Sequence, residues 1–134
     1  MKILGIIPAR GGSRGVIGKN IKTLSDKPLI AHTIIAAKKS KIVDRIIVST
    51  DSEEIAEVAI KYGAEVPFLR PKSISEDTSP ILDNYKFVFD QLRESGDSYD
   101  SFVALQPTSP FRNSYDIDCA INLFNENDVY LSLI

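Results

Sequence analysis

Short apolar runs alternate with helical patterns along this 134-residue chain. Buried strands are predicted from the length and apolar content of the runs at 2–8, 45–49, 65–68, 101–105 and 129–134. Between these runs lie segments with apolar stripes at helical spacing, which begin near Pro28, Asp51, Pro80 and Ser114. Strands that alternate with helices form parallel sheets with right-handed crossovers. The sequence therefore predicts an α/β fold, a three-layer α/β/α sandwich around a mostly parallel, Rossmann-like sheet.

Local signals predict where several helices begin or end. Asp51 is followed three residues later by Glu54, which is the pattern of a capping box. Gly63 stands where a left-handed C-terminal stop is expected, and Ser114 is the predicted N-cap of the last helix. Asp51 directly follows a strand and so also fits a metal ligand, but the helix cap is the favoured interpretation.

The first apolar run leads into a loop rich in glycine and positive charge. Residues 9–20 hold four glycines and three cations, Arg10, Arg14 and Lys19. Glycines let backbone amides approach a ligand closely, and cations beside such amides favour a polyanion such as a nucleotide triphosphate. The spacing fits neither a Walker A loop nor the dinucleotide pattern G-x-G-x-x-G. On composition alone, a solvated surface loop is an equal alternative.

The charges of the chain are distributed unevenly. Residues 1–50 carry ten Lys or Arg and two acidic residues, whereas residues 51–134 carry six Lys or Arg and sixteen acidic residues. This asymmetry favours a local anion site over a nucleic-acid surface. With one cysteine and one histidine, the chain can form neither an intrachain disulfide nor a His-rich metal site. No apolar run is long enough for a membrane span or a signal peptide, so we expect no membrane partner and a cytoplasmic location.

Five ordered segments carry a more specific signal. They are P-A-R-G-G-S-R-G-x-x-x-K-N at 8–20, K-P-L-I-A-H-T-I at 27–34, D-R-I-I-V-S-T-D at 44–51, F-L-R-P at 68–71 and L-Q-P-T-S-P-F-R at 105–112. Together they resemble the CMP-N-acylneuraminate synthetases, the cytidylyltransferases of sialic acid and related nonulosonic acids. The resemblance implies an enzyme that joins CTP to a nine-carbon acidic sugar, giving the CMP-sugar and pyrophosphate, with Mg²⁺ as cofactor.

The same resemblance implies roles for individual residues. The nucleotide is expected at Ala9, Arg10, Gly11, Gly12, Ser13, Arg14, Lys19, Asn20, Arg70, Asp77 and Ser79. Of these, Arg10 and Lys19 are the expected catalytic cations. The sugar is expected at Gln106, Thr108, Ser109 and Arg112. The residue types fit, because Pro71 favours an extended backbone at Arg70 and two prolines stiffen the loop after Gln106.

The resemblance also bears on the extent and assembly of the chain. Residues 1–134 are expected to be a single nucleotidyltransferase domain, incomplete at its C-terminus, with the metal ligands beyond residue 134. The uncovered apolar run 129–134 predicts self-association, and a homodimer is expected. One alternative is a non-catalytic CTP-binding or partner-binding remnant of such an enzyme. Another is the same chemistry on legionaminic, pseudaminic or deoxyoctulosonic acid.

Overall fold

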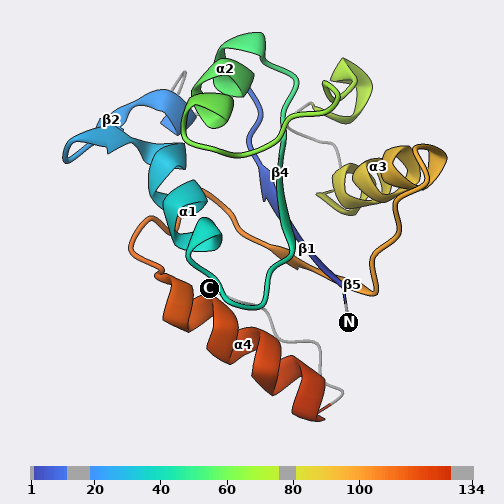
Figure 1. Cartoon of the computed structure of the whole chain (residues 1–134). Helices are drawn as coiled ribbons and strands as arrows, with labels where there is room; N and C mark the ends of the chain where they lie inside the picture. The colour runs from blue at the N-terminus through green and yellow to red at the C-terminus, as the bar shows by residue number, and fades with distance from the viewer. Residues whose placement is uncertain (1, 12–18, 76–80, 128–134) are drawn as a thin grey trace.

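A computed structural model describes residues 2–11, 19–75 and 81–127. Its central sheet consists of three parallel strands in the order β4–β1–β5. Their bounds are β1 (Ile3–Pro8), β4 (Arg45–Ser49) and β5 (Ser101–Ala104). Ile6 of the central strand pairs with Ile47 on one side and with Ala104 on the other. Because all three strands run the same way, their carboxyl ends lie at one edge of the sheet (Figure 1).

Helices cover both faces of this sheet (Figure 1). On one face lie α1 (Leu29–Lys38), α2 (Glu53–Lys61) and α4 (Ser114–Asn127), and on the other lies α3 (Ile81–Glu94). Smaller elements are the turns η1 (Lys19–Ile21) and η2 (Lys72–Ile74) and the antiparallel pair β2 (Thr23–Leu24) and β3 (Lys27–Pro28). The predicted three-layer α/β/α architecture is confirmed.

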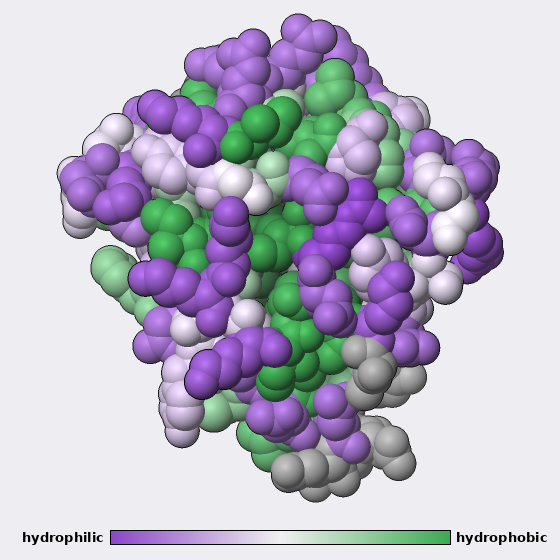
Figure 2. Space-filling model, in the orientation of Figure 1, coloured by the Kyte–Doolittle hydropathy of each residue, from purple (hydrophilic) through white to green (hydrophobic). Residues whose placement is uncertain are grey.

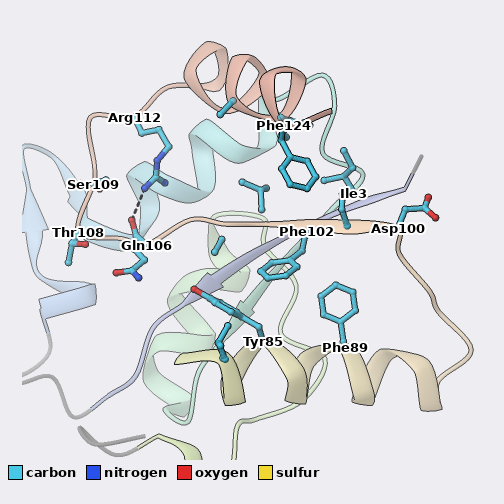
Figure 3. A pocket seen from close by; sticks show the side chains of 16 residues that line it. Ile3, Tyr85, Phe89, Asp100, Phe102, Gln106, Thr108, Ser109, Arg112 and Phe124 are labelled. Atoms are coloured by element: carbon cyan, nitrogen blue, oxygen red, sulfur yellow. Dashed lines mark hydrogen bonds between the residues drawn. The ribbon is translucent and has the colours of Figure 1, made fainter. Parts of the chain in front are cut away.

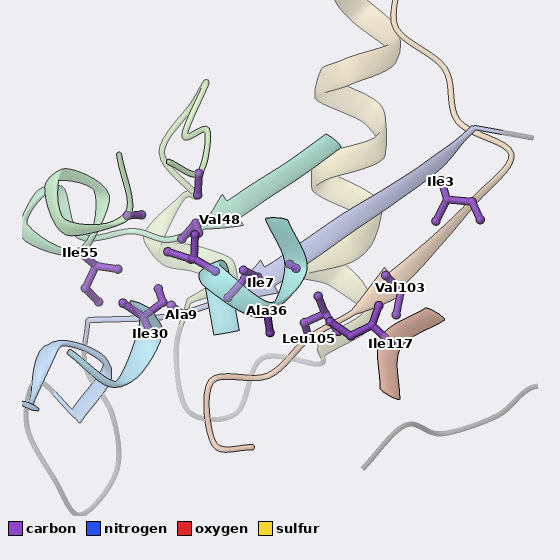
Figure 4. Close-up of a cluster of buried hydrophobic side chains, with 14 of the residues drawn as sticks. Ile3, Ile7, Ala9, Ile30, Ala36, Val48, Ile55, Val103, Leu105 and Ile117 are labelled. Atoms are coloured by element: carbon purple, nitrogen blue, oxygen red, sulfur yellow. The ribbon is translucent and has the colours of Figure 1, made fainter. Parts of the chain in front are cut away.

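Alternating side chains of β1 explain why both faces need a cover. Ile3 and Ile7 belong to the larger core cluster, together with residues of α1, α2 and α4 (Figure 4). Leu4 and Ile6 point the other way and join a smaller cluster with Val88 and other residues of α3. Polar side chains cover most of the outer surface, and apolar ones emerge in a band down the middle of the face shown in Figure 2. A strand that is apolar on both faces is typical of the centre of a parallel sheet.

The third predicted strand, 65–68, is wrong in extent. Only Glu65 forms a β-bridge, parallel to Ile47 of β4. Its amide donates to the Ile46 carbonyl over 3.1 Å, and its carbonyl accepts from Val48 over 3.0 Å. Pro67 follows and has no N–H to donate, so the pairing stops there.

Both predicted helix caps lie one residue from the observed ones. Ser52, not Asp51, caps α2, because its Oγ accepts the Ile55 amide over 3.3 Å. Asn113, not Ser114, caps α4, because its Oδ1 accepts the Asp116 amide over 2.9 Å. In both places several neighbouring residues could act as caps, and the backbone path selects among them.

The left-handed stop at Gly63 is confirmed, with φ at +98°. We expect Gly63→Ala to lower the free energy of unfolding by about 1–2 kcal/mol, since a Cβ is strained at this φ. That Cβ would also clash with Nζ of Lys38, so this side chain has to move. Gly96→Ala is the matched control, because φ there is +86° but nothing lies within 4 Å of the added Cβ. In urea denaturation both variants should lose stability and Gly63→Ala should lose more; an unchanged Gly63→Ala variant would contradict the strain.

Candidate functional site

Predicted site residues gather at the carboxyl edge of the sheet. Ala9 follows β1 directly, and its amide donates to the Ser49 carbonyl of β4 over 2.9 Å. On the other side, the Leu105 amide donates to the Ile6 carbonyl over 2.9 Å, so the segment after β5 starts at the same edge. Open parallel sheets bind ligands at this edge, where loops from neighbouring strands meet.

Both described ends of the glycine-rich loop are tied down. The Gly11 amide donates to Oδ1 of Asp51 over 2.8 Å, so β1 and β4 are joined just beyond their last residues. At the far end, Nδ2 of Asn20 donates to the Arg10 carbonyl over 3.2 Å, and Asn20 is buried. Lys19 lies beside Asn20 in η1. Arg10, Gly11, Lys19 and Asn20 thus form one group, whereas Gly12, Ser13 and Arg14 lie outside the described residues.

Arg70 is a buried cation next to this group. Its amide donates to the Thr50 carbonyl over 2.7 Å, which carries the chain past the end of β4. The residue is only 7% exposed, and its Nε has no hydrogen-bond partner among the described residues. Burial lowers the pKa of the Arg70 guanidinium, the Asp51 carboxylate opposes that shift, and the positive charge of Arg10 adds to it. A buried guanidinium with an unused donor suits an anionic or hydrogen-bonding ligand.

Asp51 is not the helix cap that the sequence predicts, and within the described ranges it belongs to no metal-binding cluster. Among the residues that the structure describes, no group of three or more His, Cys, Asp or Glu side chains could hold a metal ion. Instead the Asp51 carboxylate contacts the loop at Gly11 and acts on the charge of Arg70. The expectation of metal ligands beyond residue 134 stays a prediction.

The four predicted sugar-site residues line a cavity of about 790 Å³ beside β5. Gln106, Thr108, Ser109 and Arg112 lie at one end of it, Asp100 lies at the other end, and aromatic and aliphatic side chains line the space between them (Figure 3). Nη2 of Arg112 donates to the Gln106 carbonyl over 3.3 Å, while its Nε and Nη1 are buried without a partner in the described part of the chain. Burial lowers the pKa of Arg112, and Asp116 opposes the shift. In the described part of the chain, Arg112 thus has two nitrogen donors without a partner beside this end of the cavity.

Tyr85 links the two groups of residues, and the sequence analysis did not single it out. It lies on α3 and is buried, and it lines the same cavity as Gln106 (Figure 3). Burial raises the pKa of Tyr85, whereas the nearby Gln106 side chain and the charge of Arg70 lower it. Its place in the apolar stripe of α3 made it look like an ordinary core residue. The neighbouring Asn84, a polar residue in the same buried stripe, was a signal that this part of α3 lies near a site. Asp77 and Ser79, also expected at the nucleotide, lie outside the described residues.

No helix within the described ranges is long and apolar enough to cross a membrane.

Comparison with solved structures supports the architecture. The fold superposes with a TM-score of 0.78 on a CMP:2-keto-3-deoxy-manno-octonic acid synthetase complexed with CTP. That alignment covers 96% of this chain and 49% of the other, at 20% identity, and so shows the fold alone.

Curated relatives are closer in sequence. The chain is 46% identical to the CMP-N,N'-diacetyllegionaminic acid synthase of Legionella pneumophila, over 92% of this chain and 53% of the relative. It is 42% identical to the N-acylneuraminate cytidylyltransferase of Escherichia coli, over 99% of this chain and 30% of the relative. The chain thus spans about half or less of the length of the relatives it matches. The sequence profile of the family described as cytidylyltransferase matches residues 4–133, and the chain belongs to that family.

Proposed function

We propose that this chain binds CTP and forms the nucleotide-binding part of an enzyme that joins CTP to a nonulosonic acid, releasing pyrophosphate. One observation carries the proposal. Arg70 is buried with an unused donor, and its pKa is lowered by the charge of Arg10, which lies at the start of a tethered glycine-rich loop. Membership of the cytidylyltransferase family supports cytosine as the base.

In this proposal the residues divide by the part of the substrate they meet. Arg10 and Lys19, with the loop residues Ala9, Gly11, Gly12, Ser13 and Arg14, hold the triphosphate, and Asn20 fixes the loop. Arg70, Asp77 and Ser79 surround the cytosine and ribose. Gln106, Thr108, Ser109 and Arg112 face the acidic sugar. The division is supported by the cavity, one end of which holds Arg112 with unpartnered donors that suit a carboxylate.

The proposed reaction is attack by the sugar's anomeric hydroxyl on the α-phosphorus of CTP, with pyrophosphate as leaving group. Negative charge on the phosphates has to be held and balanced as that bond breaks, and fixed cations and amides do this without reorganising. Arg10 and Lys19 are the proposed catalytic cations. Mg²⁺ is the proposed cofactor, and the described residues do not form a protein site for it. Its protein ligands are expected beyond residue 134.

Binding and turnover test the proposal separately. In calorimetry with Mg²⁺, CTP should bind more tightly than ATP, GTP or UTP; no binding, or equal binding of all four, would overturn it. Pyrophosphate release should then be measured with legionaminic, sialic, pseudaminic and deoxyoctulosonic acids. The relative at 46% identity makes legionaminic acid the first choice. CTP binding without release from any of them would favour the non-catalytic alternative.

Arg10→Ala should weaken CTP binding about tenfold or more, because a hydrogen bond to a charged group contributes about 1.5–3 kcal/mol. Cytidine, which has no phosphate, should bind the variant and the parent equally well. Arg93→Ala is the control, since Arg93 lies in the last turn of α3 and is exposed. Calorimetric titrations give all six affinities; equal loss for cytidine and CTP would contradict a phosphate role.

We also propose a homodimer in the cytoplasm. Large apolar side chains lie exposed at Leu82, Phe111 and Tyr115, at 70%, 87% and 74%, which supports a contact surface. The single cysteine supports a reducing compartment. Sedimentation velocity over a range of concentrations tests the assembly, and a monomer at every concentration would exclude it. The apolar run 129–134, expected near such a contact, lies outside the described residues.

A further inference from the structure

The Asp51 carboxylate holds the first described glycine of the glycine-rich loop. Its Oδ1 accepts the amide of Gly11, the first glycine of the loop, over 2.8 Å. The loop passes close to the turn that carries Asp51. A Cβ built on Gly11 would lie 3.1 Å from Cβ of Ser52 and 3.7 Å from Oδ1 of Asp51. Glycine therefore permits the approach, and the carboxylate fixes it.

The turn that carries Asp51 is itself held on both sides. Oγ1 of Thr50 accepts the Ser52 amide over 3.1 Å, and the Thr50 carbonyl accepts the Arg70 amide over 2.7 Å. Ser52 then caps α2 through the Ile55 amide. Thr50 is fully buried. The carboxylate thus projects from a rigid support, which is what a group needs in order to position a loop.

The charge of Asp51 has the wrong sign for a direct phosphate contact. It lies beside Arg70, whose charged form it stabilises, and Arg10 acts on the same guanidinium with the opposite sign. A carboxylate repels an approaching triphosphate, so any favourable effect of Asp51 on phosphate binding has to pass through the groups it holds.

Resting on the proposed function, we propose that Asp51 is a positioning residue that sets the start of the phosphate-binding loop through its hydrogen bond to the Gly11 amide. It does not contact the nucleotide. The hydrogen bond, not the negative charge, is the favourable contribution, and the charge opposes it. This separation can be tested because the amide of asparagine retains an oxygen acceptor of the same size without the charge.

The test compares Asp51→Asn with Asp51→Ala, using CTP, pyrophosphate and cytidine as probes. Asp51→Asn should bind CTP and pyrophosphate at least as tightly as the parent chain. Asp51→Ala should bind both about tenfold more weakly than Asp51→Asn. Cytidine should bind both variants alike, because the effect is confined to phosphate. Equal CTP affinities for the two variants would overturn the proposal, and so would a matching loss for cytidine.

The chain offers a matched control at the opposite edge of the sheet. Oδ2 of Asp44 accepts the Ile3 amide over 2.7 Å, so it holds β1 by the same chemistry at the other end. Asp44→Ala should lower the unfolding temperature as much as Asp51→Ala, yet leave CTP affinity unchanged. If Asp44→Ala weakened CTP binding equally, the role of Asp51 would be general stability and the proposal would fail.

Amide hydrogen exchange tests the positioning without any ligand. The Gly11 amide should be protected in the parent chain and in Asp51→Asn, and should exchange about tenfold faster in Asp51→Ala. Equal exchange in all three would overturn the proposal even if CTP binds. Failure of the parent chain to bind CTP would instead overturn the proposed function, while the exchange result would still decide whether Asp51 holds the loop. If the Asp51→Ala variant does not fold, Asp51→Asn still tests the role. Loss of protection at the Gly11 amide in Asp51→Asn would contradict it.

Discussion

Arg70→Met is expected to lose CTP affinity by about 10- to 100-fold, since charge-assisted hydrogen bonds contribute about 1.5–3 kcal/mol. The same variant should be as stable as the parent chain or more stable. Arg70 is 7% exposed with an unpartnered Nε, so the unliganded protein carries the desolvation cost of a buried cation. Replacing such a cation by an apolar side chain of similar volume is often neutral or stabilising. Calorimetry with CTP and urea denaturation measure the two effects.

Arg45→Met is the matched control for Arg70→Met. Arg45 lies at the amino end of β4, away from the site, and its guanidinium contacts Glu65 at 2.9 and 3.1 Å and Asp97 at 3.2 Å. Hydrogen bonds to Glu65 raise the pKa of Arg45, in contrast to the lowered pKa of Arg70. Its removal should cost up to about 1 kcal/mol of stability and leave CTP affinity unchanged. A loss of more than about 1 kcal/mol in Arg70→Met would instead give Arg70 a structural role.

Ile7→Ala should lower the free energy of unfolding by about 2–5 kcal/mol, because it removes buried methyl groups and leaves a cavity. Ile7 is fully buried in the larger core cluster, on the central strand and under the helical layer (Figure 4). A domain of this size has only about 5–15 kcal/mol of stability, so the loss should be a large part of the total. Urea denaturation at 25 °C gives the difference.

Ile60→Ala provides the comparison, because Ile60 lies on α2 and is 58% exposed. The same atoms are removed there without a cavity, so the change should stay within about 0.5 kcal/mol. Equal losses for the two variants would show that burial in the core does not set the cost.

The sequence predicted the layered fold well because its strongest signal is physical. Four isoleucine or leucine side chains in the six residues of β1 can be buried on both faces only inside a sheet with two covers, and α3 lies opposite the other helices as that requires. The gathering of Arg10, Asn20 and Gln106 at one edge follows from the same parallel order. Their expected roles as ligand contacts stay predictions.

Features that depend on three-dimensional approach were out of reach. Nothing local distinguishes Ser52 from Asp51 as a cap; the difference arises because Gly11, forty residues earlier, takes the Asp51 carboxylate. Tyr85 has the spacing of a core residue and is one, yet it also lines the same cavity as Gln106. The hairpin of β2 and β3 has two residues per strand and turns at Ser25, which has a positive φ of 63° that residue type did not signal.

The central place of β1 has a consequence for how the chain is made. β1 precedes both of its partners, and Leu4 is paired with Arg45 on one side and with Phe102 on the other. Ribosomes add about 5–20 residues per second, so roughly 5–20 s pass between the synthesis of β1 and that of its second partner, β5. During that interval an uncharged run of high β-propensity is exposed beside other nascent chains. We therefore expect the yield of folded protein to depend on chaperones that cover the first ten residues during translation.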